Sequence, residues 1–192
     1  MSGHGFHVHG PHDHEAEHQA QHEPGGLAGQ IAVITALLAT VGACFGYMGG
    51  LTQANAGLYK NNAAITKTEA ADKWNYYQAK ANKQNLAELA AELVSNEEKR
   101  AKYQEKMARY DKEKADIKVE ADKLEAESKE WDEKSEHELH LHHRWAQATT
   151  VLQVSIALAA IAILTKKRWM LGATLVAGGI GIVLGVLAGL HI

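Results

Sequence analysis

The chain contains one cysteine and two prolines. Cysteine occurs once, at Cys44, so no disulfide can form within a single chain. Because Cys44 lies inside an apolar stretch, a small buried hydrophobic side chain is the simplest role for it. Proline is absent from residues 52–145, and glycine occurs there once, at Gly57. Long uninterrupted helices are therefore expected.

Charged side chains are missing from three stretches, residues 27–51, 146–164 and 169–190. A helix needs about 20 apolar residues to cross a hydrocarbon core of about 30 Å. We therefore predict three transmembrane helices, at 27–51, 146–164 and 170–190. The first is expected to be a retained anchor, because residues 1–26 hold no Lys or Arg, unlike the basic start of an export signal. The lack of charge inside the spans also removes the usual mark of an ion or proton pathway.

The densest basic cluster near these spans lies in the short link at 165–169, which contains Lys166, Lys167 and Arg168. Lys and Arg are enriched in cytoplasmic loops, so this link is predicted to face the cytoplasm. The arm at 1–26 would then be cytoplasmic as well. Residues 52–145 would lie on the outer, periplasmic side.

The segment 52–145 has the composition of a helical stalk. It contains 19 acidic and 17 basic side chains and is rich in Ala, Glu, Lys and Gln. Its slight negative excess argues against nucleic-acid binding, which needs a basic excess. One unbroken helix of this length would run about 140 Å, yet both ends must return to the same bilayer. An antiparallel hairpin is therefore predicted, with its turn near 94–98, where Ser95 and Glu98 match a capping box.

A seven-residue repeat predicts which faces of the two arms pack. In the second arm the main row is Tyr103, Tyr110, Ile117, Leu124 and Trp131, with a weaker row of Met107, Lys114, Ala121, Ser128, Ser135 and His142. In the first arm the predicted seam is Leu58, Ile65, Ala79, Leu86, Leu89 and Leu93, with Asn61, Asn75 and Asn82 in register. Both are typical of coiled-coil seams, in which a buried Asn fixes the register at a cost in stability.

Small residues recur every fourth position in two of the predicted spans. The first span has Gly42, Gly46 and Gly50, and the third has Ala173, Ala177, Gly181, Gly185 and Gly189. Helices in lipid associate through such small-residue faces. We therefore expect a homo-oligomer that packs through these rows, although the sequence leaves open whether they meet within one chain or between chains.

Residues 68–80 resemble a bacterial membrane-protein family catalogued as domain of unknown function four-three-three-seven. The matching positions are Thr68, Glu69, Ala70, Trp74, Tyr76, Tyr77, Gln78, Ala79 and Lys80. The layout is similar too: a polar His-bearing start, one span, a helical middle and two closing spans. The resemblance implies a bacterial inner-membrane location and brings no known activity. Trp74 and Tyr77 are also spaced as a packing stripe on one helix face.

Histidine is concentrated in the N-terminal arm, at His4, His7, His9, His12, His14, His18 and His22. Imidazole binds Cu, Ni and Zn ions, so the arm is a candidate metal-binding segment. If Met1 is removed, the terminus Ser2-Gly3-His4 could hold Cu(II) or Ni(II) in a square plane. The competing interpretation is a polar leader without a metal. The HExxH match at 14–18 is not taken as a protease motif, because it lacks a buried helix and a third ligand.

A second cluster precedes the second span. Glu136, His140 and His143 are spaced to share one helix face and could hold a divalent ion, as could the overlapping set Glu133, His137 and His140. The favoured interpretation is an interfacial girdle, in which Arg144 and Trp145 anchor at the lipid headgroups.

The sequence thus predicts an all-α membrane protein with three spans and a helical-hairpin stalk. The favoured function is a non-enzymatic scaffold or accessory subunit whose stalk contacts an envelope protein and whose arm binds a metal. The rival is a metal-ion channel or transport component with a pore formed by oligomerisation. No phosphate-binding loop or nucleophile elbow indicates an enzyme.

Deleting residues 1–24 tests the arm. We expect purified full-length protein to retain Cu, Ni or Zn after desalting, and the deletion variant to lose it, because seven of the twelve histidines lie there. Metal content is measured by mass spectrometry after acid digestion. Equal metal content in the two proteins would contradict a metal-binding arm.

Overall fold

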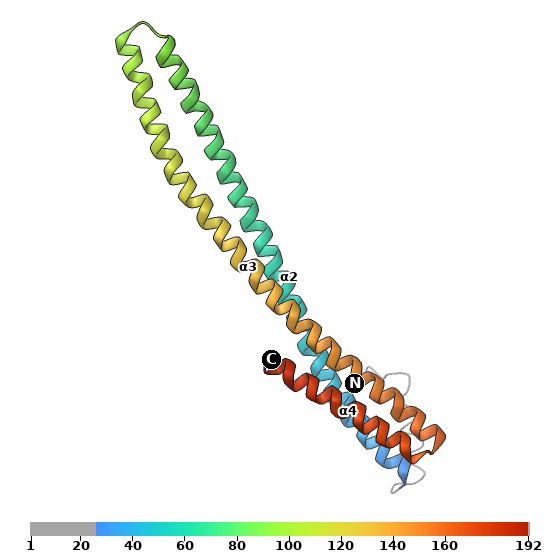
Figure 1. Cartoon of the computed structure of the whole chain (residues 1–192). Coiled ribbons are helices and arrows are strands. Elements are labelled where there is room, and N and C mark those ends of the chain that lie inside the picture. Colours follow the sequence, from blue (N-terminus) through green and yellow to red (C-terminus); the bar gives the residue numbers. More distant parts are fainter. Residues whose placement is uncertain (1–25, 192) are drawn as a thin grey trace, which may run out of the picture. The chain divides into compact units, whose positions relative to one another are not determined.

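The computed structural model describes residues 26–191, and every regular element in this range is a helix (Figure 1). The helices are α2 (Leu27–Leu93), α3 (Glu97–Thr165) and α4 (Arg168–Gly189). The all-α prediction is confirmed. Each helix contains a window long and apolar enough to cross a membrane. The chain divides into two compact units, residues 55–137 on the one hand and the segments 26–54 and 138–191 on the other.

The two long helices run without a break from apolar sequence into charged sequence. α2 has 67 residues and α3 has 69. Neither contains a proline, and their charged parts are rich in strong helix formers, so nothing in the sequence ends them early. The first helix ends where expected, because Val94–Asn96 are not helical. The second link is Lys166–Lys167, where Lys166 takes a left-handed φ of 52°.

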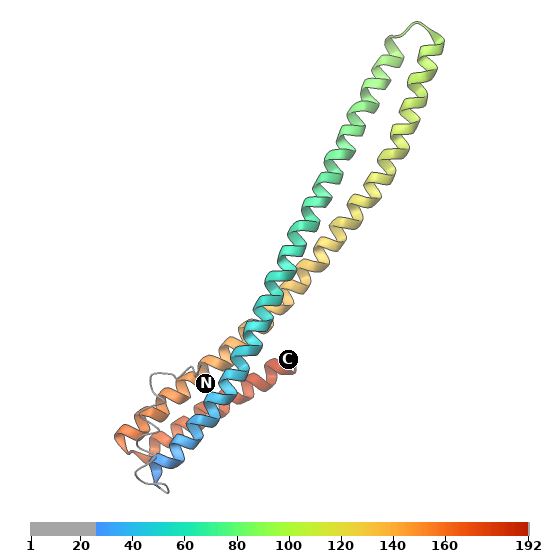
Figure 2. The same ribbon diagram turned by 180° about the vertical axis from the view of Figure 1, so that it is seen from behind.

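In the unit formed by residues 55–137, α2 and α3 lie side by side in both views (Figures 1 and 2). Three ion pairs join the helices, and each step forward along α2 is matched by a step backward along α3, so the pairing is antiparallel. The pairs are Lys60–Asp132 at 2.5 Å, Lys73–Glu120 at 2.5 Å and Lys80–Glu113 at 2.6 Å.

The contact face of α3 is the predicted one, whereas that of α2 is not. Ile117, Ala121, Ser128 and Ser135 are buried on α3, as its seven-residue rows indicated. On α2 the buried side chains of this unit are Thr66 and the alanines Ala56, Ala63, Ala70, Ala87 and Ala91. The predicted Leu and Ile seam of α2 faces away from α3, and its large members Leu58, Ile65, Leu86, Leu89 and Leu93 are 50–75% exposed.

Hydrogen bonds to the α2 backbone explain why alanine occupies the contact face. Ser128 Oγ donates to the carbonyl oxygen of Ala63 at 2.9 Å, and Ser135 Oγ donates to that of Ala56 at 2.8 Å. Such bonds require the α3 side chains to reach the α2 main chain. A row of leucines in this place would hold the helices apart and break the bonds.

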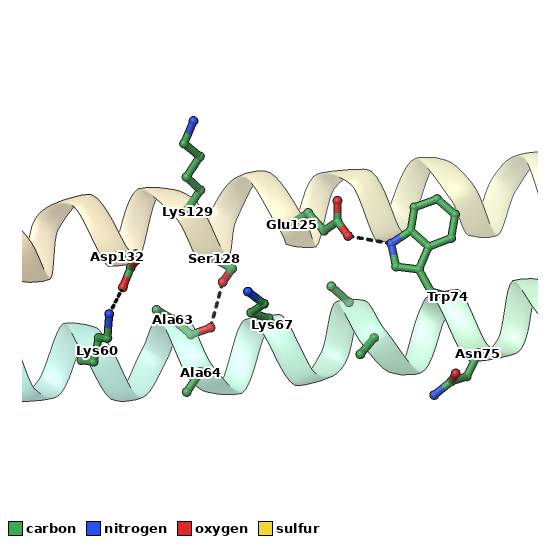
Figure 3. Close-up of a pocket in the computed structure, with 12 residues that line it drawn as sticks. Lys60, Ala63, Ala64, Lys67, Trp74, Asn75, Glu125, Ser128, Lys129 and Asp132 are labelled. Carbon is green, nitrogen blue, oxygen red and sulfur yellow. Dashed lines mark hydrogen bonds and ion pairs between the residues drawn. The ribbon is translucent and has the colours of Figure 1, made fainter.

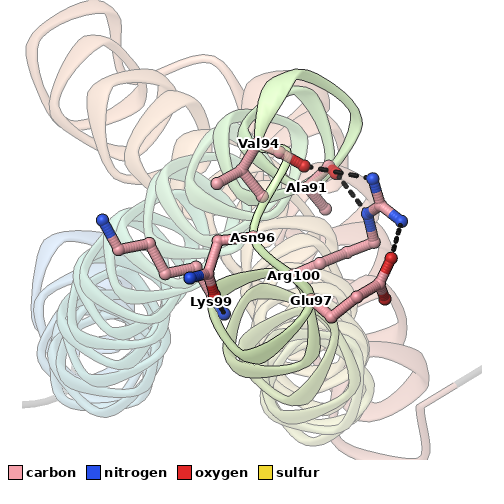
Figure 4. A network of polar contacts seen from close by, with 6 residues as sticks. All are labelled: Ala91, Val94, Asn96, Glu97, Lys99 and Arg100. Carbon is pink, nitrogen blue, oxygen red and sulfur yellow. Dashed lines mark hydrogen bonds and ion pairs between the residues drawn. The ribbon is translucent and has the colours of Figure 1, made fainter.

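One side chain closes the turn between α2 and α3 (Figure 4). The Arg100 guanidinium donates to the carbonyl oxygens of Ala91 at 3.3 Å and Val94 at 3.1 Å, and it pairs with Glu97 at 2.8 Å. It thereby satisfies carbonyls that the end of α2 leaves open.

The capping residue at the start of α3 differs from the prediction. The side chain of Asn96 accepts from the backbone N–H of Lys99 at 3.0 Å, so Asn96 rather than Ser95 caps the helix. The cap moves by one residue because α3 begins at Glu97, which makes Lys99 its third helical residue. The predicted capping box of Ser95 and Glu98 is therefore wrong.

In the other unit, the first part of α2, the last part of α3 and α4 form a three-helix bundle. At one end Ile31 packs in a cluster with Ala159, Ala162, Ile163 and Met170. Further along, Leu152 is fully buried between Gly42 and Gly181. Ser155, also fully buried, donates to the carbonyl oxygen of Thr174 at 2.7 Å. Each of these three contact groups therefore contains residues from more than one helix.

The glycine rows of α2 and α4 differ in whether neighbouring side chains pack against them. A Cβ placed at Gly181 would lie 2.8 Å from the Leu152 side chain, and one at Gly185 would overlap the ring of Phe45. These hollows of α4 are filled within the same chain. On α2, by contrast, Gly46 and Gly50 have no such neighbour within 4 Å, and Gly42 is in ordinary contact with Leu152. A Cβ placed at Gly189 would lie 3.6 Å from the Trp145 ring.

Gly181→Ala tests this packing against Gly179→Ala on the same helix. The new methyl at 181 meets Leu152 and its backbone nitrogen at 3.2 Å, so we expect a loss of about 1–3 kcal/mol. The position at 179 has open space, and Ala there should be neutral or gain up to about 1 kcal/mol. Thermal unfolding in detergent measures both. Equal melting temperatures would contradict the close contact.

Candidate functional site

The predicted metal ligands of the arm lie outside the described residues. They are His4, His7, His9, His12, His14, His18 and His22. A role for this arm in holding Cu, Ni or Zn stays a prediction.

The second histidine cluster lies on α3, where Glu136, His140 and His143 are all exposed. Within residues 26–191 no three His, Cys, Asp or Glu side chains come close enough together to hold a metal ion. This finding covers Glu136, His140 and His143 and also the alternative set with Glu133 and His137. The spacing along one helix is therefore not accompanied by a formed ligand group.

His142, which the sequence prediction placed only in a weak packing row, contacts the backbone of α2. Its Nδ1 lies 2.8 Å from the carbonyl oxygen of Gly49, and its ring lies 5.7 Å from that of His143. The contact depends on a glycine in the facing helix, because a Cβ at Gly49 would lie 3.3 Å from Trp145 Cβ. Such a pairing between distant segments leaves no local sequence signal.

Trp145 also differs from the girdle interpretation. It is 7% exposed, packs its ring 5.2 Å from that of Phe45 and lies against Gly189. A headgroup anchor would present its ring at the surface of the bundle. Gly49 and Gly189 have no side chains, so the Trp145 ring can pack within the bundle. The anchoring role predicted for Trp145 is therefore wrong.

The residues that carried the family resemblance form contacts between the two helices of the 55–137 unit. Trp74 Nε1 donates to Glu125 Oε1 at 2.8 Å. The Trp74 ring meets that of Tyr77 edge to face at 5.6 Å, and the Lys114 ammonium lies 5.6 Å from the Tyr77 ring centre. Trp74 and Tyr77 therefore contact side chains of α3, which agrees with the packing role expected for them.

Lys80 is the most enclosed cation of this segment. Its side chain is 14% exposed, and its ammonium lies 5.1 Å from the Tyr76 ring and 5.7 Å from the Tyr110 ring. The hydrogen bond to Glu113, reinforced by Tyr76, raises the pKa of Lys80 above its ordinary value. The same bond lowers the pKa of Glu113, with Arg109 adding to the effect. Both groups are therefore held in their charged forms over a wide pH range.

An open groove of about 850 Å³ lies between the helices of the same unit (Figure 3). Ala63, Ala64, Ala70 and Ala71 line it with small apolar side chains, and the Trp74 indole spans from α2 toward α3 at one end. The charged lining residues are Lys60, Lys67, Glu125, Lys129 and Asp132. Lys67 and Lys129 make no ion pair in the described part of the chain. The Ser128 hydroxyl in the lining donates a hydrogen bond to the carbonyl oxygen of Ala63. The alanines and the two lysines without an ion pair among the described residues suit contact with an acidic, partly apolar segment.

These features define an all-α protein in which a charged antiparallel helix pair and an apolar three-helix bundle are built from the same long helices. The family model described as "Domain of unknown function (DUF4337)" matches residues 27–191, which includes all three helices, so the chain belongs to this family. The family predicted from the sequence is therefore confirmed. No curated protein and no solved structure matches the chain.

Replacing Glu113 by Gln tests the enclosed ion pair through its pH dependence. Because the pKa of Glu113 is lowered, its contribution is present above the ordinary Glu pKa of about 4.3 and is lost as pH falls through the lowered value. Because the pKa of Lys80 is raised, its contribution is complete below about 10.4 and is lost as pH rises through the raised value.

The stability difference between wild type and Glu113→Gln should therefore form a plateau between those limits and shrink on both sides. Thermal unfolding followed by circular dichroism across the pH range measures it. Glu105→Gln is the control, because Glu105 is exposed on the same helix and has no ion pair among residues 26–191. A pH-independent difference would show that the charges do not contribute.

Proposed function

We propose that the protein is a non-enzymatic membrane scaffold or accessory subunit that presents a charged two-helix stalk in water. The observation that carries this proposal is the unbroken course of α2 and α3 from apolar into charged sequence. Helices of this length extend about 100 Å, whereas the hydrocarbon core is about 30 Å thick. The apolar segments fit the lipid, and the charged segments belong outside it.

The surface of the bundle supports its insertion. Large aliphatic side chains point outward on all three helices, and Val33, Leu37, Leu164, Val176 and Val183 are 58–67% exposed. In water this much exposed apolar surface would be unfavourable, but it is compatible with lipid. Hydroxyl groups within the bundle bond to helix carbonyls, as Ser155 and Thr174 do. Such bonding is required where no water is present.

The stalk has the features of a docking element. Three ion pairs, the Trp74–Glu125 hydrogen bond and the serine bonds to the α2 backbone fasten α2 and α3 together. The groove beside Trp74 adds a surface with two lysines that have no ion pair in the described residues. We propose that an acidic segment of an envelope protein binds there.

The basic link supports an orientation for this scaffold. Lys166 and Lys167, which link α3 and α4, and Arg168, which begins α4, are exposed. Placing this link in the cytoplasm puts the arm at 1–26 inside the cell and residues 52–145 in the periplasm of a bacterial inner membrane.

The rival function is a metal-ion channel or transport component, in which the arm would deliver ions to a pore. Leu152 and Phe45 fill the hollows of α4 within one chain, so a pore would have to form between copies. The open glycines of α2, Gly46 and Gly50, are the face available for such an assembly. Homo-oligomerisation through this face is part of both proposals.

Cysteine labelling in intact cells tests the anchor and its orientation. In a Cys44→Ser background we expect Ser95→Cys, at the turn, to react with a membrane-impermeant maleimide from outside. Lys167→Cys should react only after permeabilisation. The reverse pattern would overturn the orientation, and recovery of the protein in the soluble fraction would overturn the membrane anchor.

Flux through liposomes separates the scaffold from the channel. We expect vesicles that contain the full chain to show no more Zn²⁺ or Cu²⁺ entry than empty vesicles. Metal entry that disappears when the seven arm histidines become alanine would favour the channel. The same alanine variant serves as the control for bilayer leakage.

A further inference from the structure

The outer face of α2 carries a second seam that α3 does not use. Leu58, Ile65, Ala79, Leu86 and Leu93 occupy one seven-residue row, and Leu89 lies in the neighbouring row. All six are exposed, and Leu93 reaches 75%. Their row is distinct from the buried alanine row of Ala56, Ala63, Ala70 and Ala91, which also repeats every seven residues. α2 therefore has two helical seams, one filled by α3 and one open within the described residues.

The polar residues of the open seam favour a partner with the same sequence. Its second row contains Asn61, Thr68, Asn75, Asn82 and Leu89, and these asparagines are exposed or partly exposed rather than bonded to α3. An amide side chain can donate to and accept from an identical amide opposite it. Asn within a coiled-coil seam therefore pairs best with Asn of a second helix in the same register.

We propose that this open seam, residues 58–93 of α2, binds the same seam of a second copy of the chain, parallel and in register. The direction rests on the proposed function, because two copies inserted in one membrane with the same orientation must present α2 in the same direction. In a parallel pair each residue of the seam meets its own counterpart, so Asn75 faces Asn75 and Asn82 faces Asn82. The α3 helices then lie on the outside of the pair.

The charge pattern selects the stretch that pairs most strongly. The rows of the seam contain a single charged residue, Asp72, and two copies would bring these carboxylates together. Like charges in such a seam are destabilising, so the pairing is strongest beyond this point, where Ala79, Asn82, Leu86, Leu89 and Leu93 follow without a charge. A different partner chain would need to bury three asparagines without identical partners, which is less favourable.

Disulfide trapping tests the pair in the full chain in its native membranes. In a Cys44→Ser background, Asn82→Cys and Leu86→Cys place one thiol each on the open seam. Oxidation should convert both variants to disulfide-linked dimers, because identical residues of a parallel pair lie within the distance that a disulfide spans. Val119→Cys is the matched control, since Val119 is apolar and 69% exposed but lies on α3.

A second pair of variants keeps the test decisive. Leu86→Asp combined with Leu93→Asp in the Asn82→Cys protein should abolish the dimer, while Val119→Asp in the same protein should leave it unchanged. Absence of a dimer from Asn82→Cys and Leu86→Cys, a dimer from Val119→Cys of equal yield, or linkage to a different protein would each overturn the proposal. Recovery of the variants in the membrane fraction shows that the anchor is intact, so failure of the pair is distinguishable from failure of the membrane assignment.

Discussion

Close approach of helix backbones at small residues is the constraint on which both units depend. In the helix pair, Ala63 and Ala56 allow Ser128 and Ser135 to reach the α2 carbonyl oxygens. In the bundle, the glycines of α4 receive side chains of α2 and α3. Small residues on the contact faces let the helix backbones approach each other closely. The helix pair therefore relies on the alanines of α2, and the bundle relies on the glycines of α4.

The enclosed ion pair adds specificity to a contact face that is otherwise made of alanine. A row of alanines fits another helix in several registers, since each residue resembles the next. Lys80 meets Glu113 and two tyrosine rings, and Trp74 donates to Glu125, so a shift of one turn would separate all of these groups. These aromatic and basic residues thus fix the register of α2 against α3.

The sequence was sufficient to predict the helices, their apolar windows, the turn near 94–98 and the packing face of α3. These features follow from composition and from periodicity along one segment. The face of α2 was mispredicted because leucine was taken as the buried row, whereas the serine-to-backbone bonds favour alanine. The roles of His142 and Trp145 were also missed, because they depend on Gly49 in a segment far away along the chain. Periodicity within a single helix carries no information about such pairings.

The filled hollows of α4 have a consequence for how the bundle is held together. Leu152, which occupies the space at Gly181, lies in the neighbouring helix and is joined to α4 by the two-residue link Lys166–Lys167. Phe45, which occupies the space at Gly185, belongs to the first helix, near the opposite end of the chain. Packing of α4 therefore requires both neighbours, because α3 supplies Leu152 and α2 supplies the Phe45 ring. The Phe45 ring beside Gly185 thus joins two parts of the chain that lie far apart in the sequence.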